Sequence, residues 1–164
     1  NGRTAVSSKL NRGLLMQAQI LAPAAILVLW SLIMLFWMAG TRLPALKKME
    51  GGGLGNAAPG GRGQDLEGVI DPKVQWKAHN YAHLMEQPTI FYPTVVILAV
   101  MGAGAIDVTL AWIYVALRII HSVYQATVNK VSVRFMIFLV SSLVLIALAI
   151  RAVIATLFAD PGVL

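Results

Sequence analysis

Two charged side chains lie inside apolar stretches of this chain, where they could do chemistry. Arg118 stands in the sequence Trp-Ile-Tyr-Val-Ala-Leu-Arg-Ile-Ile-His, and Glu86 stands in His-Leu-Met-Glu-Gln-Pro. An ionised side chain in hydrocarbon costs at least about 2.5–3.5 kcal/mol unless a partner or water compensates it. We therefore expect Glu86 and Arg118 to form a buried, charge-assisted pair, and we expect any function to lie at that pair.

Histidines accompany both charged residues at helical spacing. His79, His83 and Glu86 follow an i, i+4, i+7 pattern, which places them on one helix face. His121 lies one turn after Arg118. If the two helices are antiparallel neighbours, Glu86, Arg118 and His121 lie within about one turn of each other in depth.

This cluster has four possible roles on spacing alone. A Glu–Arg pair can fix helix packing without any ligand. The same groups can line a polar pocket for a cofactor or substrate, open to the cytoplasmic leaflet, or form a proton relay through histidine and glutamate. A metal site on His79, His83 and Glu86 is disfavoured, because a closed site needs a fourth ligand in register; we assign no metal.

Composition predicts an integral membrane protein. Of 164 residues, 58% are hydrophobic and only 12% are charged, against about 25% charged in soluble domains. The formal net charge of +6 does not indicate nucleic acid as a partner, since basic residues in such a chain gather beside the membrane. There is no cysteine, which excludes disulfides and thiolate sites. The partner is the lipid bilayer.

The elements that position the cluster are long apolar runs. We predict one membrane domain, residues 1–164, of four transmembrane helices at about 15–39, 74–104, 108–128 and 131–158, with a glycine-rich loop at 40–73. The first run is interpreted as a retained helix, not a signal peptide. Pro88 and Pro93 should bend the second helix, and Asp107 should cap or precede the third.

Basic residues also predict the orientation. Most of them flank one side of the predicted bundle: Arg42, Lys47, Lys48, Arg62, Lys73, Lys77, Lys130 and Arg134. The other side has Arg3, Lys9 and Arg12. The positive-inside rule places the glycine-rich loop in the cytoplasm and both termini outside.

The order of these features resembles the MAPEG superfamily, the membrane-associated proteins in eicosanoid and glutathione metabolism. The shared features are the carboxylate of Glu86, the Arg-x-x-His of Arg118 and His121, and Arg134 opening the last helix. The resemblance covers residues 77–151 and points to the bacterial branch. Known members are homotrimers that bind glutathione between four-helix subunits. It therefore implies an all-α four-helix bundle, a homotrimer in the bacterial inner membrane, and glutathione as cofactor.

The resemblance also implies roles for individual residues. Arg134 matches the arginine that activates the glutathione thiol in catalytic members. The candidate glutathione-binding residues are Glu86, Arg118, His121, His83, Asn80 and Tyr124. Four positions depart from the family pattern. His83 stands where the family has Asn, and Ala82 stands where prostaglandin synthase carries an Arg. Gln125 replaces the family Tyr, although its neighbour is Tyr124, and Pro88 comes one residue early.

Two functions are compatible with these residues. One is a glutathione-dependent transferase or peroxidase, in which a cation near the thiol favours the thiolate and a lipophilic electrophile arrives from the bilayer. The other is a non-catalytic scaffold or auxiliary subunit of a larger membrane complex. In that case Glu86 and Arg118 would be a structural lock, and the departures from the family pattern favour it.

Overall fold

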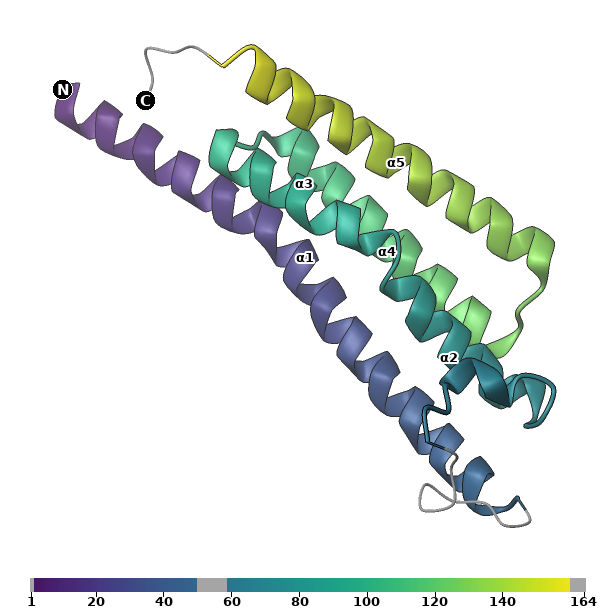
Figure 1. Ribbon diagram of the computed structural model, residues 1–164. Helices are drawn as coiled ribbons and strands as arrows, with labels where there is room; N and C mark the ends of the chain where they lie inside the picture. The colour runs from purple at the N-terminus through teal and green to yellow at the C-terminus, as the bar shows by residue number, and fades with distance from the viewer. Residues whose placement is uncertain (1, 50–58, 160–164) are drawn as a thin grey trace.

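The described part of the chain is all-helical. The computed structural model describes residues 2–49 and 59–159, with side chains from residue 15 onward. The elements are α1 (Gly2–Lys47), the short 3-10 helix η2 (Gly63–Leu66), α2 (Pro72–Leu84), α3 (Pro88–Met101), α4 (Ala105–Thr127) and α5 (Val131–Leu157). Helices α1 and α5 lie on opposite sides, with α2, α3 and α4 between them (Figure 1). The start of α1 and the end of α5 lie at the same end of the bundle.

Four helical segments of the described residues are long and apolar enough to cross a membrane. They are Leu15–Lys47, Pro72–Met101, Ala105–Thr127 and Val131–Leu157. Many large apolar side chains on them face outward, among them Phe36 and Val100, as expected where lipid replaces water around the helices. The prediction of an all-α membrane bundle is therefore confirmed.

The second crossing consists of two helices, where the sequence predicted one helix over residues 74–104. Helix α2 ends at Leu84, residues 85–87 form a turn, and α3 begins at Pro88. Proline has no backbone N–H and is favoured in the first turn of a helix, where that N–H would have no partner within the helix. Pro88 therefore starts a new helix, while Pro93 lies inside α3.

Helix α1 is longer than predicted at both ends. It continues beyond residue 39 to Lys47, with Gly40 and Pro44 inside it. The segment after Gly40 is rich in Leu, Ala and Lys, which favour helix, and the connection to α2 is correspondingly shorter than residues 40–73. The glycine stretch at residues 51–55 lies outside the described residues.

An ion pair joins the start of α4 to the end of α5. Helix α4 begins at Ala105, and the Asp107 carboxylate accepts a hydrogen bond from the Gly104 backbone N–H (2.8 Å). Arg151 donates to the same carboxylate through Nε and through Nη2 (3.2 Å). Asp107 is buried, so the pair satisfies a carboxylate that would otherwise be costly inside the bundle. Asp107 thus lies in the first turn of α4 and not ahead of it.

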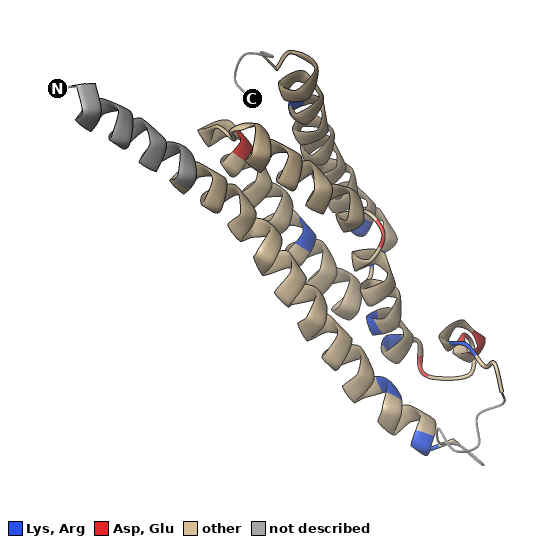
Figure 2. Ribbon diagram, turned by 60° about the vertical axis from the view of Figure 1, so that its left-hand side comes forward, with Lys and Arg blue, Asp and Glu red and all other residues tan. Residues whose placement is uncertain are grey.

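Most of the other basic residues whose side chains are described lie at the opposite end of the bundle. We call this the loop end: the end where α1 and α4 finish and where α2 and α5 begin (Figure 2). Lys77 lies over the ring of Trp37 there, 5.8 Å from its centroid. Lys, Arg and Trp are typical of membrane–water boundaries.

Candidate functional site

Arg118 lies at the centre of the bundle, where it caps the end of α2. Its side chain is completely buried (0% exposed). Nη2 donates to the backbone oxygen of His83 at 2.9 Å. That oxygen is one of the last four carbonyls of α2, which have no partner within the helix, and the C-terminal end of a helix attracts a cation. Because α2 ends before Pro88, the His83 carbonyl has no partner within the helix and accepts the hydrogen bond from Arg118.

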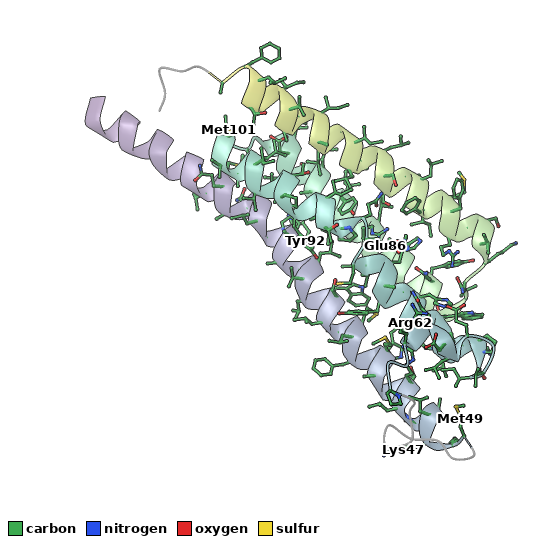
Figure 3. The ribbon with its side chains drawn as sticks, viewed as in Figure 1. Lys47, Met49, Arg62, Glu86, Tyr92 and Met101 are labelled. Atoms are coloured by element: carbon green, nitrogen blue, oxygen red, sulfur yellow. The ribbon has the colours of Figure 1, made fainter. Side chains whose placement is uncertain are left out.

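The predicted contact between Glu86 and Arg118 is not formed in the chain, and that prediction was wrong. Glu86 lies in the turn between α2 and α3 (Figure 3), with its side chain 67% exposed. Because α2 ends before Glu86, the carboxylate does not continue the helix face of His79 and His83. It is hydrogen-bonded to His83 Nδ1 at 2.8 Å instead.

His83 stands between the two charged residues. Arg118 Nη1 lies 3.4 Å from His83 Nε2. A guanidinium has donors only, so Nε2 must accept and the ring proton of a neutral His83 lies on Nδ1, from which it donates to Glu86. The departure from the family pattern at His83 therefore links Glu86 to Arg118 through an imidazole.

A pocket adjoins this cluster between α2, α4 and α5. We call it the histidine pocket; its volume is about 170 Å³, and it is lined by His83, His121, Val131, Arg134, Phe135 and Phe138. The rings of His83 and His121 are 4.9 Å apart, and the ring of Phe138 lies 5.3 Å from His83. Three of the predicted site residues therefore meet in one pocket: His83, His121 and Arg134.

Arg134 is held in place by the turn between α4 and α5. Its Nη1 donates to Oδ1 of Asn129 at 2.7 Å. Asn129 has a positive φ of 55°, a conformation in which Asn is one of the few favoured non-glycine residues. This bond positions the guanidinium at the pocket, and its other N–H groups have no hydrogen-bond partner among the described residues, so they can bind a ligand.

The other predicted site residues lie outside the histidine pocket. Asn80 is 1% exposed, and neither of its side-chain polar atoms has a partner among the described residues. Gln125 is also buried, with an unpartnered Oε1. Tyr124 is half-buried and does not line the pocket. Buried polar groups are nearly always paired, whereas these polar atoms of Asn80 and Gln125 are buried in α2 and α4 without a partner among the described residues.

Sequence reasoning missed the aromatic wall of the pocket. Phe138 follows Arg134 by one helical turn on α5, and Phe135 is its neighbour. The i, i+4 spacing was the available signal. Gln87, in the turn between α2 and α3, connects that turn to α5 and α4. Its Nε2 donates to Ser142 Oγ at 2.7 Å, and its Oε1 accepts from the Tyr114 hydroxyl at 3.4 Å.

The arrangement favours an acceptor-rich, anionic ligand. Arg134 supplies fixed N–H donors to the histidine pocket, and the imidazole of His121 supplies polar ring atoms, while both ring nitrogens of His83 already contact Glu86 and Arg118. The phenyl rings of Phe135 and Phe138 make part of the wall apolar, and a low local dielectric strengthens polar interactions beside it. Within the described residues, no group of three or more His, Asp or Glu could hold a metal ion.

Comparison with known proteins gives one result. Searches of curated proteins and of solved structures returned no significant match. The model of the MAPEG family matches residues 20–154, which include all four membrane-spanning segments in part or whole and every residue of the histidine pocket. The chain therefore belongs to the MAPEG family, as a membrane protein of four apolar helical segments.

Proposed function

We propose that this protein is a glutathione-dependent transferase or peroxidase that acts on lipophilic electrophiles. The observation that carries the proposal is the histidine pocket, in which Arg134, His121 and His83 meet. Arg134 and His121 are at the positions where the family resemblance implies glutathione binding. Glutathione has two carboxylates and several carbonyl oxygens, which suit a pocket rich in donors.

Each residue has a distinct part in this proposal. Arg134 is held by Asn129. Its guanidinium would lie beside the thiol of bound glutathione, and a nearby cation favours the thiolate form of that thiol. His121 orients the ligand, His83 holds Glu86 and Arg118 in place, and Phe135 and Phe138 provide apolar wall. When bound, glutathione supplies a sulfur nucleophile, and an apolar electrophile would reach it from the bilayer, past the exposed apolar side chains of the helices.

Glu86 supports a homotrimer with the site between subunits. Its exposed carboxylate lies in the middle of the Pro72–Met101 segment, where contact with lipid would be costly. A neighbouring copy covering this face would remove the carboxylate from lipid and let it bind a ligand amine. We place the protein in the bacterial inner membrane with the loop end cytoplasmic and both termini periplasmic, since basic residues gather at that end.

Glutathione should bind saturably in the millimolar range or tighter, measured by calorimetry or thermal shift on the protein in detergent. We expect Arg134→Ala to weaken binding about tenfold, equivalent to about 1.4 kcal/mol. Lys130→Ala, which removes an exposed cation from the same turn, is the matched control and should bind normally. If glutathione leaves the parent protein unchanged, the enzyme proposal fails.

The second candidate is a non-catalytic scaffold or auxiliary subunit of a larger complex. The observation in its favour is that Arg118 Nη2 and His83 are already bonded within the chain, as in a packing lock. Particle mass after mild solubilisation separates the candidates. We expect the mass of three chains; stoichiometric recovery with another protein would favour the scaffold, and a clean monomer would contradict the trimer.

A further inference from the structure

A second pocket lies at the loop end and shares no residue with the histidine pocket. Its volume is about 230 Å³. The residues of its wall that matter here are Glu67, Ile70, Gln75, Trp76, His79 and Asn129. They come from the η2 segment, the first turns of α2 and the turn after α4. We call it the loop-end pocket.

Gln75 gives this pocket a buried donor without an acceptor. The side chain is only 4% exposed, and its Oε1 accepts from Arg42 Nη2 at 3.2 Å. Its Nε2 has no partner among the described residues, and neither has Arg42 Nε. Unpaired buried donors are rare and call for an explanation. A ligand oxygen on Gln75 Nε2 would lie one amide group away from the Arg42 guanidinium, which favours an anionic oxygen.

Glu67 gives the same pocket an opposite charge. Its Oε1 is hydrogen-bonded to His79 Nε2 at 2.8 Å, and 57% of its side chain is exposed. A carboxylate in the same wall disfavours a simple anion but attracts a ligand amine. Trp76 and Ile70 add apolar surface. The pocket thus presents a donor beside a cation and, separately, a carboxylate, which matches a ligand that carries both charges.

The position of the pocket indicates where such a ligand comes from. Gln75 lies about 4.5 Å from the start of α2, and Asn129 is the second residue after α4. The Lys77–Trp37 contact lies on the same part of α2, and Lys47 and Arg62 lie at this end (Figure 3). Helix ends with Trp and Lys are typical of the level of lipid headgroups.

We propose that the loop-end pocket binds the headgroup of an aminophospholipid, a phosphate diester that carries a primary amine. The phosphate accepts a hydrogen bond from Gln75 Nε2 beside Arg42, and the ammonium group lies against Glu67. This site is separate from the histidine pocket and does not depend on glutathione.

Gln75→Glu is the sharpest test, because it keeps the size and the acceptor for Arg42 but replaces the free donor by a negative oxygen. The delipidated protein in detergent is titrated with short-chain phosphatidylethanolamine and followed by native mass spectrometry. We expect saturable binding to the parent protein and at least tenfold weaker binding to Gln75→Glu. Gln64→Glu makes the same change at an exposed position of η2 and should bind like the parent. Equal binding to all three proteins would overturn the proposal.

Two further experiments test whether the ligand carries an amine and whether it is a lipid. Glu67→Gln removes the carboxylate from an exposed segment, so the fold should persist, and it should abolish the preference for phosphatidylethanolamine over phosphatidylglycerol. If the parent protein has no such preference, the amine assignment is wrong. Soluble phosphoethanolamine tests the source: we expect at least tenfold weaker binding than the lipid, and equal affinity would overturn the lipid assignment.

Discussion

Replacing Arg118 by Met should lower the free energy of unfolding by about 1–3 kcal/mol. The substitution is similar in length and removes a buried charge, but it leaves the His83 carbonyl without its donor, and an unsatisfied buried acceptor costs about that amount. The loss should be measured by equilibrium unfolding in mixed detergent micelles. Because the freed carbonyl lies at the helix break, we expect the junction of α2 and α3 to exchange amide hydrogens faster than in the parent.

Glu86→Gln is the comparison that decides between the expected ion pair and the observed cap. Its carboxylate is largely exposed and contacts His83, not Arg118, so the substitution should cost less than about 1 kcal/mol. The Arg118→Met/Glu86→Gln double variant should show a coupling energy of at most about 1 kcal/mol, because the two side chains interact only through His83, which contacts both of them. A coupling energy of several kcal/mol would show that the two side chains touch, contrary to the geometry described above.

Arg134→Ala should reduce kcat/KM for glutathione conjugation by about 10²–10³-fold, the usual loss when one group that stabilises developing charge is removed. Without the cation less of the bound thiol is ionised at neutral pH, so part of the rate should return at alkaline pH. Turnover of a lipophilic electrophile across a range of pH measures both effects. Arg134→Lys keeps the charge and should retain more activity than Arg134→Ala.

Asn129→Gly tests the position of the Arg134 guanidinium without changing its charge. Glycine adopts the positive φ of residue 129 without strain, while Oδ1, which holds Arg134, is lost. We expect a smaller fall in kcat than for Arg134→Ala, with little change of KM and with the pH dependence of the parent. An Asn129→Gly enzyme with full activity would show that Arg134 needs no anchor, and a fully active Arg134→Ala enzyme would exclude its role at the thiol.

The sequence by itself determined the membrane-spanning class, the number of apolar segments and the family. These follow from local properties: the length and composition of uncharged runs, and the types and spacing of Glu86, Arg118, His121 and Arg134. Which of these side chains lie close together on neighbouring helices was only partly predictable. His121 and Arg134 share the histidine pocket as expected, because the short turn after α4 brings the two helix ends together.

Only the tertiary structure decided what Arg118 binds. A hydrophobic run does not show that a proline will end one helix and start another, and so it does not show which backbone carbonyls are left free. The break at Pro88 turned Glu86 outward and offered the His83 carbonyl to Arg118. The Asp107–Arg151 pair and the Gln75–Arg42 contact were likewise hidden, because each joins residues from different helices, and sequence spacing determines neighbours only along one helix.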